Sequence, residues 1–349
     1  MREPLQPKRL IAPAIFVFLV FGALLWRRPA AVEEPQVQRF NGATMGTTWS
    51  VLVAGPAEPS LSLEVQAELD RVDALMSTWK PDSELSKLNA APATSSLSPQ
   101  TLEVLVLART VHEQTGGAFD VTVGPLVNAW GFGPEGVQAP DEDELRRIST
   151  FVGQELLILG DSSATKAHPE LYVDLSAIAK GYAVDLVSQR LEELGYGDHM
   201  VEVGGEIRVS GLKDIDTPWV LAVEAPVAGQ RGQVHRQFQA TDLALATSGD
   251  YRNFREVEGG ERVSHTIDPR VGLPIEHDLA SVSVVHERCV LADAYATAIN
   301  VLGPEDGYRL AQELQLEALL VVRNEDGSFS EKGTGRFASD PGADAASPG

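Results

Sequence analysis

The sequence predicts an α+β protein in which antiparallel strands are flanked by helices, and two kinds of segment lead to this expectation. Residues 219–224 and 233–245 are rich in β-forming side chains, and the chain between them is too short for a helical crossover. Residues 61–76 and 99–115 instead carry apolar side chains at helical intervals. The chain has 349 residues, of which 43% are hydrophobic, so its length suits one large domain or two closely associated ones.

The amino terminus contains an uncharged apolar run at residues 10–26, with basic residues on both sides. Its length lies at the lower edge of a membrane span, and Arg27 and Arg28 stand where small residues should precede signal cleavage. We therefore expect a retained anchor rather than a cleaved signal, with the body outside the cytoplasm as the simpler orientation. The expected organisation is an anchor or signal segment at 1–29, a linker at 30–38, one domain at 39–330 and a disordered tail at 331–349.

The charge balance excludes one large class of partner. A formal net charge of -22 argues against nucleic-acid binding, because phosphate backbones are held by Lys and Arg. An anionic substrate would need a local positive group or a metal ion. Cys289 is the single cysteine, so the chain has neither a disulfide framework nor a cysteine-based metal cluster.

The expected helices and strands are located from the spacing of apolar residues and from the turn-forming residues between them. A β-prone run at 40–53 predicts the first strand, and Asp141 is suited to cap a helix at 141–148. Paired glycines inside 195–211 predict a strand with a bulge or a close backbone approach. Residues 83–89 are expected to form a short helix or a turn, and 291–302 and 304–314 to form helices. The other expected strands are 155–160, 280–286 and 318–323, and a hairpin is expected between 245–254 and 264–272.

The stretch Asp174–Asp185, which reads D-L-S-A-I-A-K-G-Y-A-V-D, is the centre of the predicted site. Apolar residues alternate up to Leu175 and then recur at helical spacing, so a strand passes into a helix here. A helix start leaves backbone N–H groups unpaired and accepts a phosphate, to which Lys180 could add positive charge. An ordinary strand and helix with Lys180 in solvent is the alternative.

Two further stretches carry polar groups at suggestive spacing. Asp293 and Thr297 lie one helical turn apart among alanines, an oxygen-lined niche suited to a hard cation such as Mg²⁺. His265 and Asp268 lie in the expected hairpin with arginines nearby, which suits proton transfer or anion binding, although a single His is more often structural. Trp79 fits either a half-buried lid over the core or a platform for a ring.

These segments, in order, resemble the ApbE family of FAD:protein FMN transferases. The resemblance covers nearly all of the chain after the anchor. The matching motifs are M-G-T-T-W-S-V at Met45, S-T-W-K-P-D-S-E-L-S-K-L-N at Ser77, G-G-A-F-D-V-T-V-G-P-L-V-N-A-W-G-F-G at Gly116, the stretch at Asp174, V-G-G-E-I at Val203, A-T-S-G-D-Y-R-N-F at Ala246, H-T-I-D-P-R-V-G at His265 and A-D-A-Y-A-T-A at Ala292.

The resemblance implies a fold, a reaction and a set of site residues. The fold would be an α+β body of antiparallel sheets with flanking helices, similar to a T-fold, in a bacterial inner-membrane protein facing the periplasm. FMN would pass from FAD to a threonine of a partner protein with a Ser/Thr-Gly-Ala-Thr type motif, and AMP would leave. Mg²⁺ would be held by Asp293, Thr297 and the carbonyl of Ala177, and His265 or Asp268 is the candidate base. The residues implied for FAD binding are Met45, Trp79, Ala118, Phe119, Asp120, Lys180 and Ile267.

Two other functions remain open at this point. Related enzymes split FAD to FMN and AMP with water as the acceptor, and the sequence separates this activity poorly from transfer. A flavin-binding protein without turnover is the second alternative, although it would not need a metal at the pyrophosphate.

Overall fold

The computed structural model describes residues 37–133, 140–226, 233–249, 254–256 and 262–338. The predicted anchor at 10–26 lies outside these residues. Among the helices that are described, none combines the length and the apolar character that a membrane crossing requires. The chain separates into a unit at 1–36 and a unit at 37–349, and only the second is described below.

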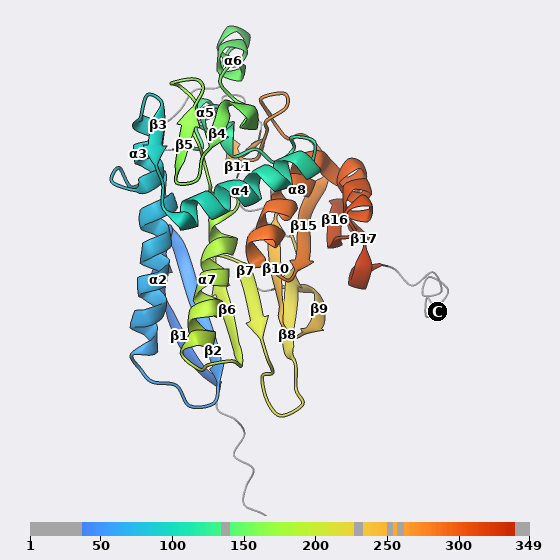
Figure 1. Ribbon diagram of the computed structural model, residues 1–349. Coiled ribbons are helices and arrows are strands. Elements are labelled where there is room, and N and C mark those ends of the chain that lie inside the picture. The colour runs from blue at the N-terminus through green and yellow to red at the C-terminus, as the bar shows by residue number, and fades with distance from the viewer. Residues whose placement is uncertain (1–36, 134–139, 227–232, 250–253, 257–261, 339–349) are drawn as a thin grey trace, which may run out of the picture. The chain divides into compact units, whose positions relative to one another are not determined.

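An eight-stranded antiparallel sheet is the centre of the second unit (Figure 1), as expected for an α+β protein. Its order is β1-β2-β6-β7-β10-β15-β16-β17. The strands are β1 Val37–Thr44, β2 Thr47–Ala54, β6 His199–Val203, β7 Glu206–Ser210, β10 Leu243–Ser248, β15 Leu279–His286, β16 Glu317–Arg323 and β17 Phe329–Gly333. Smaller sheets are formed by β3 Thr94–Ser96, β4 Leu157–Leu159 and β5 Ser163–Lys166, by β8 Trp219–Glu224 with β9 Val234–Ala240, by β11 Phe254–Glu256 with β12 Arg262–Ser264, and by β13 Ile267–Asp268 with β14 Leu273–Pro274.

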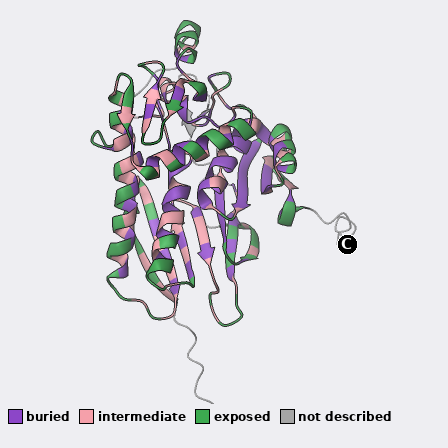
Figure 2. Ribbon diagram, viewed as in Figure 1, coloured by how far each residue is buried: buried purple, intermediate pink, exposed green. Residues whose placement is uncertain are grey.

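The two faces of the large sheet bury different partners. Side chains such as Val201, Ala246 and Val284 pack with the helices, whereas Val209, Leu245 and Val285 pack with β8 and β9. Both faces are buried at the centre of the sheet (Figure 2). The helices are α2 Leu61–Met76, α3 Glu84–Ala90, α4 Pro99–Gln114, α5 Gly124–Ala129, α6 Glu142–Ser149, α7 Ala179–Glu193 and α8 Cys289–Glu313, and the 3-10 turns are η1 Val121–Val123, η2 Gln154–Leu156 and η3 Gly335–Phe337.

Several predicted boundaries are wrong because turns interrupt continuous β-prone runs. The expected strand at 40–53 is the β1–β2 hairpin, whose turn holds Met45 at φ 49° and Gly46 at φ 72°. Gly204 and Gly205, at φ 61° and 108°, form the turn of the β6–β7 hairpin rather than a bulge. Residues 233–245 divide into β9 and β10 in the same way. Leu171–Leu175 is not part of a strand, although its apolar side chains are buried.

The prediction of a disordered tail at 331–349 is also wrong for residues 331–338, which the structure describes. Residues 331–333 belong to β17, and η3 follows it with a buried Phe337. Phe337 packs edge to face on Phe238, with ring centroids 5.4 Å apart, and so closes the β8–β9 side of the core. Residues 339–349 lie outside the described part of the chain. The predicted linker at 30–38 is wrong at its last two residues, because Val37 and Gln38 belong to β1.

The two helices expected at 291–302 and 304–314 form one element, α8, with a break between them. Gly303 has φ 79° and Pro304 follows it. A proline has no N–H to continue the helix, and the carbonyl of Asn300 instead bonds Nε2 of His277 at 2.7 Å. The first part of α8 reaches the candidate site and the second part does not.

Candidate active site

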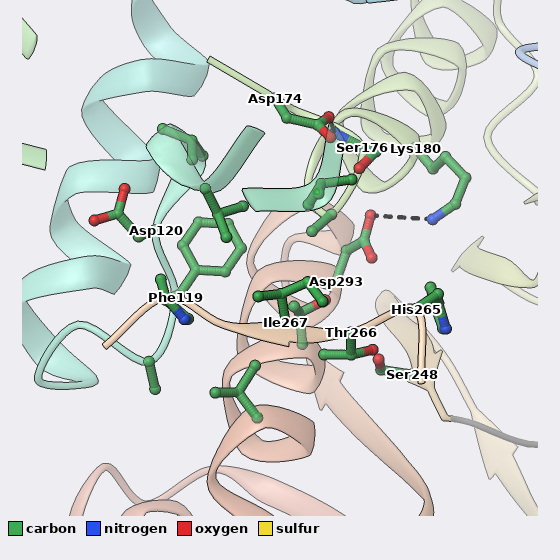
Figure 3. A pocket seen from close by; sticks show the side chains of 18 of the residues that line it. Phe119, Asp120, Asp174, Ser176, Lys180, Ser248, His265, Thr266, Ile267 and Asp293 are labelled. Carbon is green, nitrogen blue, oxygen red and sulfur yellow. Dashed lines mark hydrogen bonds and ion pairs between the residues drawn. The ribbon is translucent and has the colours of Figure 1, made fainter. Parts of the chain in front are cut away.

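A cavity of about 340 Å³ opens where the N-terminal turns of α7 and α8 meet the ends of β7 and β10. Figure 3 shows side chains from α7, α8 and β10, and from the segments around Phe119 and Ile267, converging on it. The predicted residues among its lining are Ala118, Phe119, Asp120, Ala177, Lys180, His265, Ile267, Asp293 and Thr297. The remaining lining includes Asp174, Ser176, Gly204, Glu206, Thr247, Ser248, Gly249 and Thr266.

Lys180 stands in the first turn of α7, where the predicted change of period occurs. Its Nζ lies 3.0 Å from Oε1 of Glu206 and 3.7 Å from Oδ2 of Asp293. Figure 3 shows Lys180 and Asp293 pointing toward one another. Burial alone would lower the pKa of Lys180, but the charges of Asp293 and Glu206 outweigh it and the pKa is raised. The ammonium is therefore permanently charged, and the reading of Lys180 as a solvated side chain is wrong.

Glu206 is a site residue that the sequence reasoning did not single out. Its side chain is buried, and its Oε2 atom has no hydrogen-bond partner among the described residues. Burial raises the pKa of Glu206 to about 7, against the opposing effect of Lys180. Glu206 could have been found from its position directly after the paired glycines of V-G-G-E-I. These glycines form the turn between β6 and β7, so Glu206 is the first residue of β7 and faces the cavity.

The oxygen groups predicted to hold a metal lie on this cavity together. Asp293 is buried, and its Oδ2 accepts a hydrogen bond from the backbone N–H of Gly181 at 3.0 Å. Thr297 follows one helical turn later, and Ala177 lines the same wall. Across the described residues, no group of three or more His, Cys, Asp or Glu side chains is arranged to hold a metal. A cation here would be coordinated by the carboxylate of Asp293, the hydroxyl of Thr297 and the carbonyl of Ala177.

This donor set fits a hard divalent ion. Asp293 and Glu206 face the single ammonium of Lys180, so the cluster has an excess of negative charge when both carboxylates are ionised. The unpartnered Oε2 of Glu206 is a further acceptor beside it. Oxygen ligands of this kind suit Mg²⁺, which keeps several waters and shares substrate phosphates.

Asp174 contributes another acceptor at the entrance to α7. Its Oδ1 accepts the backbone N–H of Ser176 at 2.8 Å, which closes the turn before the helix. Burial raises the pKa of Asp174 despite this bond. The turn places Ser176 and Ala177 at the cavity wall, with small side chains that leave the backbone accessible.

The two candidate bases differ in position. His265 lines the cavity and packs edge to face on Phe132, with ring centroids 6.4 Å apart. Asp268 does not line it. Both carboxylate oxygens of Asp268 are bonded to Arg270, at 2.9 and 2.6 Å, so the pair braces the turn between β13 and β14. The geometry favours His265.

Asp120 lines the cavity, but both oxygens of its carboxylate are already hydrogen-bonded within the protein. Its Oδ1 accepts hydrogen bonds from the backbone N–H and the hydroxyl of Thr122 at 2.7 and 2.6 Å. Its Oδ2 accepts the N–H of Gln154 at 3.1 Å and lies 3.3 Å from Nδ1 of His112. The hydrogen bond to Asp120 is the main cause of a raised pKa for His112. Asp120 therefore fixes the loop that carries Phe119 rather than offering a free carboxylate.

Met45 and Trp79 are the two predicted flavin-binding residues that the structure does not bring to the cavity wall. Met45 forms the tight β1–β2 turn and packs on the core. Trp79 lies in the turn after α2 and is 69% exposed, so it does not cover the core as a lid. Its exposed ring is compatible with the platform alternative.

The cavity thus combines a fixed ammonium, buried carboxylates, small-residue walls and the starts of two helices, an arrangement suited to a phosphate-containing ligand with a cation. The sequence profile described as the ApbE family matches residues 45–320. "FAD:protein FMN transferase" of Vibrio cholerae serotype O1 is 42% identical over 317 residues, which are 88% of this chain and 94% of the relative.

Solved structures agree with this match. "Flavin Transferase ApbE from Vibrio cholerae" superposes with a TM-score of 0.79 at 40% identity and covers 87% of this chain and 98% of its own. The apo form of Pseudomonas stutzeri flavinyl transferase ApbE gives 0.80 at 37% identity and covers 87% and 96%. The resemblance expected from the motifs is confirmed: this chain belongs to the ApbE family.

Proposed function

We propose that this chain is an FAD:protein FMN transferase, which uses FAD as its substrate and a protein as its acceptor. The relatives that match most of its length carry this name. The observation that supports it most directly is the convergence of Lys180, Glu206 and Asp293 on one cavity built from the family's motifs.

The finer proposal is that Mg²⁺ is required, held by Asp293, Thr297 and the carbonyl of Ala177. The buried carboxylate of Asp293 and the oxygen donors of Thr297 and Ala177 on the same cavity support this assignment. A bound Mg²⁺ would supply positive charge to the pyrophosphate of FAD and polarise the phosphorus under attack. It would also let an acidic protein hold an anionic substrate.

The protein's own groups would orient the reactants and move the proton. The ammonium of Lys180, fixed by two carboxylates, balances charge that develops on the phosphate oxygens. His265 would accept the proton of the acceptor's hydroxyl. That oxygen bonds to the phosphorus of the FMN half, the bond from this phosphorus to the bridging oxygen breaks, and AMP leaves.

The acceptor hydroxyl is proposed to be a threonine in a Ser/Thr-Gly-Ala-Thr type motif. Small flanking residues would suit the wall formed by Gly204, Thr247 and Gly249. We further propose that residues 10–26 anchor the protein in the bacterial inner membrane with its body in the periplasm, supported by the apolar run and its basic flanks.

The test is an acceptor-labelling assay with the full-length chain in detergent, FAD, Mg²⁺ and a small protein that carries such a motif. We expect an acceptor band with flavin fluorescence on a denaturing gel, lost with EDTA and in Asp293→Ala. An acceptor whose threonine is replaced by valine is the matched control, and its band should show no flavin fluorescence.

Other outcomes identify the alternatives. Free FMN and AMP in equal amounts, with an unlabelled acceptor, would show hydrolysis of FAD by water. Retention of FAD without any product would show a flavin-binding protein, and the proposal would then fail.

A further inference from the structure

Helices α7 and α8 each supply the carboxylate that satisfies the other's N-terminal turn. Asp293 of α8 accepts the N–H of Gly181 in α7 at 3.0 Å. In return, Asp185 of α7 accepts the N–H groups of Cys289 and Val290 in α8, at 2.9 and 3.0 Å. The residue before α8, Arg288, makes no side-chain cap of its own. The cap of α8 is therefore supplied by another helix.

The spacing of these residues makes the exchange possible. Gly181 and Asp185 are four residues apart on α7, and Cys289 and Asp293 are four apart on α8, so each pair lies on one helix face. The helices meet closely because Gly181 has no side chain. A Cβ atom at this position would lie 2.4 Å from the carbonyl oxygen of Cys289. The position of Asp293 relative to α7 is thus set by the same contact.

Asp185 is itself held in place from the sheet. Nη1 of Arg208, in β7, lies 2.9 Å from Oδ1 of Asp185 and also donates to the carbonyl of Glu287, just before α8. Asp185 does not line the cavity, so it cannot touch FAD or the cation there. Its hydrogen bonds to Cys289 and Val290 connect it to the turn of α8 that carries Asp293.

We propose that Asp185 is a positioning residue, which fixes the first turn of α8 and thereby holds Asp293 where it binds the metal ion. This inference rests on the proposed function for its consequence in flavin transfer, but not for the geometry that it describes. Partners that orient metal ligands typically change metal affinity by about 10- to 100-fold when they are replaced.

The decisive variant is Asp185→Asn in the full-length chain. An amide has one acceptor oxygen where the carboxylate has two, so one cap bond is lost and Arg208 loses its counter-ion. We expect the Mg²⁺ concentration at the midpoint of the metal-induced rise in Tm, measured with FAD present, to increase by about tenfold. The half-saturating Mg²⁺ for flavin transfer should rise equally, while kcat at saturating Mg²⁺ stays within about twofold of the unaltered protein.

Asp198→Asn is the matched control, since Asp198 accepts one backbone N–H, from Leu212 at 2.8 Å, and does not line the cavity. The amide oxygen of this variant can keep the single hydrogen bond, so Tm and the Mg²⁺ midpoint should both stay unchanged. A lower Tm with an unchanged Mg²⁺ midpoint in Asp185→Asn would overturn the proposal, because a purely structural role predicts it.

A second variant keeps the test decisive if Asp185→Asn does not fold. Arg208→Gln leaves both cap bonds but removes the ion pair that holds Asp185, together with the hydrogen bond to the carbonyl of Glu287, and its Mg²⁺ midpoint should rise by about threefold. An unchanged midpoint in this folded variant would contradict the proposal. If the unaltered protein binds Mg²⁺ with a measurable midpoint but transfers no flavin, the proposed function fails and the positioning role is still tested.

Discussion

Glu206 shows how one residue can connect the chemistry of the site to stability. It is buried beside Lys180, and burial raises its pKa from 4.5 to about 7. The folded protein therefore binds this proton more tightly than the unfolded chain does. The resulting stabilisation is fully present below pH 4.5 and is lost as the pH rises through about 7.

We predict that this group makes the free energy of unfolding fall by about 3 kcal/mol between pH 4.5 and pH 8 in metal-free buffer. In Glu206→Gln this part of the pH dependence should disappear. Urea unfolding at several pH values in EDTA measures it, with Glu142→Gln, an exposed glutamate of α6, as the control. A parallel pH dependence in Glu206→Gln and in the unaltered protein would contradict the assignment.

Periodicity alone grouped site residues only where they lie close in the sequence, and the family resemblance supplied distant ones such as Phe119 and Ile267. Asp293 and Thr297 are one helical turn apart, so their common face follows from period alone. The partners of Lys180 lie far along the chain, and only the sheet order brings Glu206 to it. The hydrogen bonds between Asp268 and Arg270 depend on the side-chain rotamers within a tight turn. These rotamers could not be predicted from the sequence pattern.

At the scale of elements, amphipathic helices were predictable and short turns were not. The helix at 61–76 has the bounds expected from its apolar spacing, and Asp141 caps α6 through the N–H of Glu144. The β1–β2 turn, in contrast, needs two residues at positive φ, and one of them is Met45. Methionine gives no turn signal, so the run reads as one strand.

The 3-10 turn η3, which follows β17, offers a stability prediction. Phe337 in η3 is buried against Phe238, and replacing it with alanine removes this contact and leaves a cavity. We expect Phe337→Ala to lower the free energy of unfolding by about 3–5 kcal/mol in chemical denaturation. Leu63→Ala, at a side chain 72% exposed on α2, is the control and should have little effect. A change of similar size in both variants would show that η3 does not close the core.

At the scale of the whole molecule, the chain separates into residues 1–36 and the unit that begins at Val37. If residues 10–26 are a membrane anchor, the two parts have separable roles. We predict that deletion of residues 2–29 releases the protein from the membrane pellet after high-speed centrifugation, while flavin transfer to a soluble acceptor continues. A full-length chain that stays in the supernatant without detergent would contradict the anchor.

The break at Gly303 has a consequence for engineering this protein. A continuous helix transmits a rotation of one end to the other, but here the helical bonds stop at Gly303, and the freed carbonyl of Asn300 is taken by His277. We therefore expect the exposed side chains after the break, such as Arg309 and Glu313, to accept a fluorophore with little effect on Asp293 and Thr297, whereas the buried Gly307 and Leu310 must be kept. These exposed positions suit a reporter on a flavin-labelling reagent.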